Sequence, residues 1–389
     1  MMDLLLVNGR VMTDAGLRDD LAVAVSGDRI VATGPERALA ESAGRPRRRI
    51  DLGGDLLLPG FIDTQVNGGG GVLFNDDPTP DTIRAIGAAH RRFGTTGFLP
   101  TLISDDLDVV EAGVTAASRA IAAGAPGVLG LHLEGPFLNP HRKGVHDASK
   151  MLQLEKSHLP LLTKLAGGRT LVTLAPEFTS VGTIAALTEA GVIVAAGHTD
   201  STYDEMRAAL AAGVRGFTHL FNAMSPLASR APGVVGAALE NQTAWCGIIV
   251  DGRHVSPAVL RIALRCRPTS RFMLVTDAMP CVGSDLTAFR LNGEVVTVAD
   301  GVCRGASGAL AGSDLDMASA VRNAVALLGL DLAEASRMAS LYPAEFLGLD
   351  DQRGRIAAGF LADLVRLDDD LQVKDTWIAG LGQGDGEFA

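Results

Sequence analysis

The sequence predicts an α/β fold, a (β/α)8 TIM-type barrel with a small β-sandwich domain formed from both chain ends. The two ends of the chain alternate apolar and polar residues between turn signals, which is typical of short strands. The middle of the chain alternates short apolar runs with alanine- and leucine-rich helical segments. Eight such runs occur, and eight parallel βα units close a barrel.

The small domain is predicted at both ends of the chain. Residues 3–56 contain short alternating strands that are broken by turn signals such as Asn8-Gly9. The other end repeats the pattern, with a strand at 362–367 and a last strand near Trp377. We therefore assign residues 1–56 and 352–389 to one β-sandwich and residues 57–351 to the barrel.

The barrel is predicted from its apolar runs, which lie at residues 57–63, 96–101, 128–134, 171–177, 192–200, 216–222, 245–251 and 272–277. Helical segments fill the gaps; for example, residues 81–93 precede Gly94, a typical helix end. Residues 313–328 precede Gly329 in the same way. A doubly wound open sheet is the main alternative, but no Gly-x-Gly-x-x-Gly fingerprint follows an early strand.

Two local patterns refine this prediction. Thr202 and Glu205 have the spacing of a capping box, which predicts a helix that ends near Gly213. Residues 289–299 contain the turn Asn292-Gly293 and predict a hairpin inserted after the eighth run.

Composition and net charge exclude some classes of partner and indicate the cellular compartment. The formal net charge of −11 argues against nucleic acid or an anionic membrane as a partner. The four cysteines form no C-x-x-C pair, and no secretory signal or apolar run near 18 residues is visible. We therefore expect a soluble protein in the reducing cytoplasm.

Metal ligands are predicted where strands meet the mouth of the barrel. His198 and His219 lie where the strands of the fifth and sixth runs end, and Glu134 ends the third. A lone histidine at a strand end is more often structural, but side chains at the carboxyl ends of barrel strands converge. Three ligands of N and O type with an open fourth position suit a catalytic divalent metal. His132 shares a face with Glu134, and we expect it to pack beside the site.

Asp277 ends the eighth run and is the candidate proton-transfer residue. A carboxylate beside an activated water can take its proton and pass it to a leaving group. The alternative is a turn or helix-capping aspartate. Gln65 and Asn67 follow the first run, where many metallohydrolases built on this barrel carry His-x-His, and Glu177 ends the fourth run, where a lysine that bridges two metals would lie. Neutral amides are poor metal ligands compared with imidazole, so we expect one tightly bound metal and not a binuclear centre.

Several motifs together resemble the N-acetylglucosamine-6-phosphate deacetylases, a family of the amidohydrolase superfamily. The resemblance runs from the first strand to the last helices. Its most diagnostic parts are Glu134-Gly135-Pro136 and Leu220-Phe221-Asn222-Ala223-Met224. The other motifs are Pro59-Gly60-Phe61-Ile62-Asp63, Lys143-Gly144-Val145-His146, Gly197-His198-Thr199, Val250-Asp251-Gly252-Arg253-His254, Thr276-Asp277-Ala278 and Leu310-Ala311-Gly312-Ser313.

The resemblance implies hydrolysis of a linear amide, in which N-acetyl-D-glucosamine 6-phosphate gives acetate and D-glucosamine 6-phosphate. It implies that Glu134, His198 and His219 hold the metal, that Asp277 is the general base and acid, and that His146 contacts the acetamide carbonyl. The metal would be one divalent ion per subunit, with Zn²⁺ first and Fe²⁺, Mn²⁺ or Co²⁺ as alternatives. The residues that bind sugar and phosphate would be Gln65, Asn67, His146, Asn222, Ala223, Arg230, His254 and Leu310.

The resemblance also implies an assembly. Arg230 and His254 would reach the phosphate from a neighbouring subunit, in a homodimer or homotetramer with shared active sites. Taken alone, either residue is more often a solvated loop residue. Two other functions stay open, namely an N-acetylgalactosamine-6-phosphate deacetylase and a catalytically silent scaffold of this fold. A silent scaffold should have lost metal ligands, and all three are present.

Overall fold

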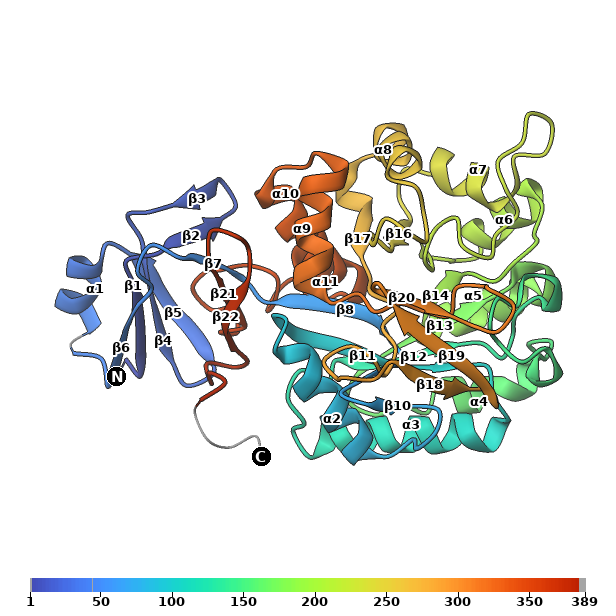
Figure 1. Ribbon diagram of the computed structural model, residues 1–389, viewed down its shortest axis with the longest axis horizontal. Coiled ribbons are helices and arrows are strands. Elements are labelled where there is room, and N and C mark those ends of the chain that lie inside the picture. Colours follow the sequence, from blue (N-terminus) through green and yellow to red (C-terminus); the bar gives the residue numbers. More distant parts are fainter. Residues whose placement is uncertain (1, 44, 385–389) are drawn as a thin grey trace.

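The computed structural model describes residues 2–43 and 45–384 of the 389-residue chain, and it has two parts (Figure 1). The larger part is a barrel of eight parallel strands, in which each strand pairs with the next along the chain. The strands are β8 (Phe61–Val66), β11 (Thr95–Ile103), β12 (Gly130–Glu134), β13 (Arg169–Leu174), β14 (Ile193–Ala196), β15 (Gly216–Phe217), β16 (Trp245–Ile248) and β17 (Phe272–Leu274).

The barrel closes just beyond the end of its eighth strand. Val66 in β8 bridges to Ala278, and the backbone N–H of Asp277 donates to the carbonyl of Gln65 at 3.0 Å. A carboxylate supports the same seam, because the hydroxyl of Thr276 donates to Asp63 at 2.5 Å. The predicted (β/α)8 barrel is therefore confirmed, and its first and last strands bring Gln65 and Asp277 together.

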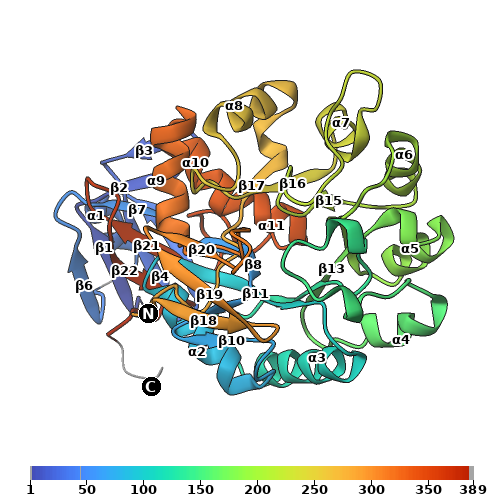
Figure 2. The ribbon, with the colours of Figure 1, turned by 45° about the vertical axis from the view of Figure 1, so that its right-hand side comes forward.

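Helices surround the barrel on its outside (Figure 2). They are α2 (Pro80–Arg91), α3 (Leu107–Ala122), α4 (Leu159–Leu162), α5 (Val181–Glu189), α6 (Tyr203–Ala211), α7 (Gly233–Glu240), α8 (Pro257–Cys266), α9 (Met317–Leu328), α10 (Leu332–Ala339) and α11 (Leu341–Leu347). Short 3-10 helices lie between them at η1 (Pro140–Arg142), η2 (Ala148–Lys150), η3 (Lys156–His158), η4 (Pro176–Phe178) and η5 (Thr269–Arg271). No helix in the described ranges is both long enough and apolar enough to cross a membrane.

Helix ends follow the predicted signals. The capping box before α6 is confirmed, because Thr202 accepts from the N–H of Glu205 and Glu205 accepts from the N–H of Thr202. Helix α9 begins later than predicted, at Met317, because Asp316 accepts from the N–H of Ser319 and caps it. The helix ends at Gly329, whose φ of 74° is the left-handed conformation that glycine adopts readily.

The smaller part is a two-sheet domain. One sheet contains β5 (Arg29–Gly34), β4 (Ala22–Ser26), β1 (Leu4–Val7) and β6 (Arg48–Asp51), with helix α1 (Glu36–Ala43) beside it. The other contains β22 (Val373–Trp377), β21 (Leu364–Leu367), β7 (Leu56–Pro59), β2 (Arg10–Thr13) and β3 (Gly16–Arg18). Leu6, Leu57 and the fully buried Trp377 share one core, so the β-sandwich built from both chain ends is confirmed.

The first predicted barrel strand, 57–63, is divided between the two parts. Residues of β7 pair with β2 and β21 in the small domain, and β8 enters the barrel. The break falls at Gly60, where an added Cβ would lie 2.2 Å from the side chain of Thr96, so the crossing backbone leaves no room for a side chain. The limits 1–56 with 352–389 and 57–351 stay our proposal for the two domains, except that the first limit moves to Gly60, because residues 57–59 belong to the sheet of the small domain.

Two small sheets line the barrel rim. The predicted hairpin is present as β18 (Ala288–Leu291) and β19 (Glu294–Ala299), which turn at Asn292 and Gly293 with positive φ. A third strand, β20 (Val302–Arg304), extends it and was not predicted, because three residues are too few to show a period. Strands β9 (Gly68–Gly69) and β10 (Val72–Leu73) form the other sheet.

Candidate metal and active site

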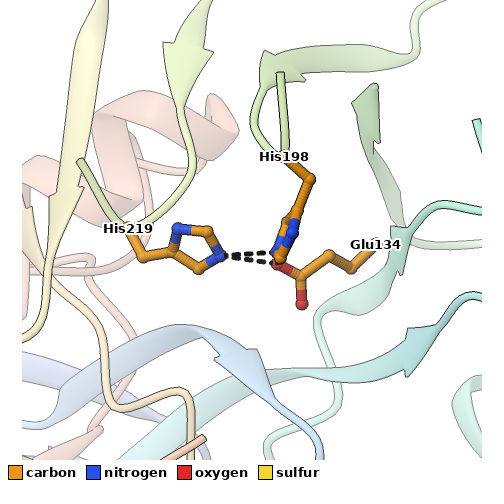
Figure 3. Close-up of side chains that lie close together, drawn as sticks. All are labelled: Glu134, His198 and His219. Atoms are coloured by element: carbon orange, nitrogen blue, oxygen red, sulfur yellow. Dashed lines mark hydrogen bonds and ion pairs between the residues drawn. The ribbon is translucent and has the colours of Figure 1, made fainter. Parts of the chain in front are cut away.

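Three ligand-type side chains meet at the mouth of the barrel. Glu134 ends β12, whereas His198 and His219 each lie two residues beyond their strands, β14 and β15. Figure 3 shows the three side chains pointing toward one another. Nε2 of His219 lies 2.8 Å from Oε1 of Glu134 and 3.1 Å from Nε2 of His198, and all three residues are buried. The sequence prediction that these residues converge is confirmed.

The hydrogen bonds of His198 make this cluster suitable for a cation. Its Nδ1 lies 2.8 Å from the carbonyl oxygen of Arg142, which can only accept, so Nδ1 carries the proton of the neutral ring. Nε2 is then a lone-pair atom, and it lies 3.3 Å from the Glu134 carboxylate. Two buried acceptors that face each other are costly unless a proton or cation lies between them. A two-histidine, one-carboxylate set fits a divalent metal with an open position.

The backbone is strained where these side chains enter the site. His198, His219 and Asp277 have φ values of 48°, 31° and 53°, in the left-handed region. For residues other than glycine this conformation costs roughly 1–3 kcal/mol each and is concentrated at functional sites. The strained residues turn the chain at the strand ends and direct their side chains into the mouth of the barrel.

Asp277 lies in a network of amides and carboxylates. Its Oδ1 accepts from Nδ2 of Asn67 at 2.7 Å and from Nε2 of Gln65 at 3.2 Å. The same nitrogen of Gln65 donates to both carboxylate oxygens of Glu134, each at 3.1 Å. The amide of Gln65 therefore lies between the carboxylate of a candidate metal ligand and that of Asp277.

Burial and neighbouring charges shift the protonation of these groups. Burial raises the pKa of Asp277 to about 6, and the Glu134 carboxylate adds to the effect, whereas His219 and His254 oppose it. Burial acts to raise the pKa of Glu134, but the close contacts of its carboxylate with the rings of His198 and His219 hold it well below its usual range. Glu134 is thus an anion, and Asp277 can change its protonation state near neutral pH.

His146 lies beside the candidate ligands as a neutral hydrogen-bond donor. Its ring centroid is 4.4 Å from that of His198. The backbone N–H of Ser104 donates to its Nδ1 at 3.2 Å, so the proton of the neutral ring is on Nε2. Burial lowers the pKa of His146 to about 3. Ser104 is packed against Gly135, where an added Cβ would lie 2.3 Å from its hydroxyl oxygen.

The predicted phosphate and sugar residues lie on the loops around the mouth. Arg230 is exposed at the tip of a tight turn that the bridge between Ala228 and Ala231 closes. His254 accompanies Asp251, whose carboxylate lies 2.6 Å from its Nδ1. The charge of His254 acts on Asp277 of the same chain. His254 therefore lies near enough to Asp277 to influence it, and its expected reach to a neighbouring site stays a prediction.

The remaining predicted residues are less tightly tied to the cluster. Asn222 follows β15, and its amide donates to the carbonyl of His219 at 3.1 Å. Ala223 has a φ of 51°, and its carbonyl accepts from the N–H of Thr199. Leu310 is half-buried at the base of the inserted sheet, where it bridges to Arg304.

The sequence interpretation missed the hydrogen-bonding roles of several side chains near the cluster. His132 was expected beside the site, and its two ring nitrogens lie 3.3 Å from Thr101 and 2.8 Å from Thr173. Glu177 was considered only as a residue in place of a second-metal ligand, but it accepts four hydrogen bonds. Its partners come from two other loops, so nothing in the local sequence pattern indicated this role.

Comparison with known proteins places the chain in a family. The model of the Amidohydrolase family matches residues 56–382. N-acetylgalactosamine-6-phosphate deacetylase of Shewanella sp. (strain ANA-3) is 44% identical over 374 residues, which are 95% of this chain and 93% of that protein. N-acetylglucosamine-6-phosphate deacetylase of Homo sapiens is 38% identical over 381 residues, which are 94% of this chain and 91% of that protein.

Solved structures agree with this assignment over the whole length. N-acetylglucosamine-6-phosphate deacetylase from Pasteurella multocida is 35% identical and has a TM-score of 0.94, covering 98% of this chain and 100% of its own. A mutant of the Mycobacterium smegmatis enzyme, in complex with N-acetyl-D-glucosamine-6-phosphate, is 35% identical with a TM-score of 0.90, covering 98% and 99%. The chain therefore belongs to the amidohydrolase family of metal-dependent enzymes, in the branch that contains the N-acetylglucosamine- and N-acetylgalactosamine-6-phosphate deacetylases.

Proposed function

We propose that this enzyme hydrolyses the acetamide of N-acetyl-D-glucosamine 6-phosphate to D-glucosamine 6-phosphate and acetate. The observation that carries the proposal is the convergence of Glu134, His198 and His219 with Asp277 at one barrel mouth. The named activities of the relatives over the full chain support the choice of substrate.

One divalent ion would be held by Glu134, His198 and His219, with Zn²⁺ the first choice for this donor set. When bound, such an ion polarises a carbonyl and activates water. The amide of Gln65 supports a single ion, because its Nε2 donates to both Glu134 and Asp277 and so lies between the two carboxylates. An amide N–H donor excludes a metal from that position.

Asp277 is the proton carrier of the proposed reaction. Its carboxylate takes a proton from the attacking water and then gives it to the departing amine. The two amide donors from Gln65 and Asn67 hold one of its oxygens and leave the other for the proton. A pKa raised by burial suits both roles, because the group must accept and release a proton near neutral pH.

His146 donates a hydrogen bond from Nε2 to the acetamide oxygen. The N–H of Ser104 fixes this tautomer, so the donor is in place before the substrate binds. A neutral ring can stabilise developing negative charge without changing its own protonation. Both properties support a role for His146 in stabilising the oxyanion.

The substrate would be held by groups from several loops of the mouth. Asn67 keeps a buried Oδ1 that has no partner in the described part of the chain, and this oxygen can accept from a sugar hydroxyl. His254 keeps its Nε2 for the phosphate, since Asp251 holds its Nδ1. Further contacts are proposed for Gln65, Asn222, the Ala223 backbone and Leu310.

Arg230 would bind the phosphate of a second subunit. It lies at an exposed loop tip, and an apolar groove of about 280 Å³ is lined by residues of the same loop, α7 and α8. Leu227 and Ile262 in this groove are 58% and 59% exposed. A second copy of the chain would cover these side chains and bring Arg230 to its neighbour, in a homodimer or homotetramer with shared active sites.

A second candidate substrate is N-acetyl-D-galactosamine 6-phosphate. The Shewanella relative, 44% identical over 374 residues, is named for this epimer. The two substrates differ at one hydroxyl and require the same chemistry. We further propose that the enzyme works in the cytoplasm, which agrees with the four free cysteine thiols.

The proposal is tested by acetate release from a panel of N-acyl amino sugars, with and without 6-phosphate, after loading with Zn²⁺, Fe²⁺, Mn²⁺ or Co²⁺. We expect the highest kcat/KM with a 6-phosphorylated N-acetylhexosamine, and the ratio between the gluco and galacto epimers decides between the two candidates. Equal activity on phosphorylated and unphosphorylated sugars, or none on either, would reject the proposed substrate.

A further inference from the structure

Glu177 in η4 connects three loops of the barrel mouth through its carboxylate. Oε1 accepts from Nδ2 of Asn139 at 2.8 Å and from the backbone N–H of Asp200 at 2.6 Å. Oε2 accepts from the hydroxyls of Thr199 and Ser201, each at 2.5 Å. All four donors are neutral, and none belongs to η4. Each carboxylate oxygen thus accepts two hydrogen bonds, and together these bonds join η4 to Asn139 and to residues 199–201.

These groups surround the candidate metal ligand His198 on both sides. Thr199, Asp200 and Ser201 follow it directly in the chain. On the other side, the N–H of Asn139 donates to the carbonyl of His198 at 2.9 Å, in addition to the bond of its side chain with Glu177. Glu177 therefore holds residues 199–201 close to Asn139, the residue whose N–H binds the backbone carbonyl of His198.

The segment that contains Asn139 also orients the imidazole ring of His198. The carbonyl of Arg142, three residues after Asn139, accepts from Nδ1 of His198 at 2.8 Å. The guanidinium of Arg142 pairs with Asp200 at 2.6 Å and joins the two segments a second time. His198 has a φ of 48°, a conformation that persists only where the surroundings over-determine it. The loops that Glu177 ties together supply that constraint.

We propose that Glu177 is a positioning residue for the metal site, which holds His198 in its strained conformation so that Nε2 meets Glu134 and His219. The inference rests on the proposed metal site, and it assigns to Glu177 no contact with metal or substrate. It predicts that removing the Glu177 carboxylate lowers the affinity for the metal in a protein that still folds.

The test compares Zn²⁺ affinity, measured by competition with a chromophoric chelator, in the wild type, Glu177→Ala and Glu177→Gln. Groups that orient metal ligands typically contribute about 10- to 100-fold to affinity, so we expect Glu177→Ala to bind Zn²⁺ weaker by that factor. Glu177→Gln should stay within about 3-fold of the wild type, because the hydroxyls of Thr199 and Ser201 can turn and accept from the amide. Glu189→Ala, an exposed glutamate at the end of α5, is the matched control.

The outcomes separate this inference from the proposed function. A wild-type protein that binds no Zn²⁺ would overturn both. Wild-type affinity in a folded Glu177→Ala protein, or an equal loss in Glu177→Gln, would overturn the inference alone. If Glu177→Ala does not fold, Ser201→Ala decides, since it removes one donor and keeps the carboxylate. We expect it to weaken Zn²⁺ binding by about 2- to 10-fold, and unchanged affinity would contradict the proposal.

Discussion

Replacing Asp277 with asparagine isolates its proton-transfer role, because the substitution keeps the shape of the side chain. The amide that replaces the carboxylate keeps one oxygen as the acceptor for Asn67 and Gln65, which lie 2.7 and 3.2 Å away in the wild type. The network around Glu134 should therefore stay intact, and metal content should be unchanged. General acid–base catalysis contributes about 10²–10⁴-fold, so we expect kcat to fall at least ~10²-fold, or ~2.7 kcal/mol.

The pH dependence of acetate release gives a second readout of the same variant. Asp277 must be deprotonated to accept a proton, and burial raises its pKa to about 6. The wild-type kcat/KM should therefore rise with pH on the acid side and level off above the pKa. A bound cation favours the carboxylate and moves this limb to lower pH. Near-normal kcat in Asp277→Asn, or an unchanged acid limb, would remove Asp277 from the mechanism.

Three further variants test the phosphate, the oxyanion and the barrel seam. Arg230→Ala should lower kcat/KM about 10- to 150-fold with the 6-phosphorylated substrate and leave kcat/KM for the unphosphorylated substrate unchanged. Mixing Arg230→Ala chains with Asp277→Asn chains should restore part of the activity. If subunit exchange is proven and activity does not return, the shared-site proposal is refuted. His146→Asn keeps an acceptor for Ser104 and removes Nε2, so kcat should fall about 10²–10³-fold with metal retained; a loss under about 10-fold would exclude the oxyanion role. Burial raises the pKa of Asp63 to about 7, so the stability that its protonated form contributes is present at low pH and lost as pH rises. In urea unfolding, the free energy of unfolding of Asp63→Asn should therefore increase relative to that of the wild type by up to about 3 kcal/mol between about pH 5 and 8. A difference that does not change with pH would refute this.

The barrel was predictable because its signal is local and repeated. Each βα unit carries a buried run followed by a helix with its own capping residues, such as Thr202 before α6. The division of the first run at Gly60 was not predictable in the same way, since it depends on how closely Thr96 approaches from the next strand. Apolar residues such as Leu57 and Phe61 look alike in the sequence, although they enter different sheets.

The candidate site was predictable in its residue types but not in its connections. Ligand-type side chains at three strand ends identified Glu134, His198 and His219, and the structure brings them together. Both histidines were expected to end their strands, but each lies two residues beyond its strand in a left-handed conformation, which apolar runs cannot reveal. The contacts of Gln65 and Glu177 join residues far apart in the chain, so only the folded structure shows them.

The most direct test of the proposed mechanism is a titration of metal-free enzyme with Zn²⁺, followed by acetate release from N-acetyl-D-glucosamine 6-phosphate and its galacto epimer. The three-ligand cluster and the amide of Gln65 beside it predict that activity rises linearly and stops at about one equivalent per chain. The metal-free enzyme should be inactive. Full activity without metal, or a break at two equivalents, would contradict a mechanism built on one ion held by Glu134, His198 and His219.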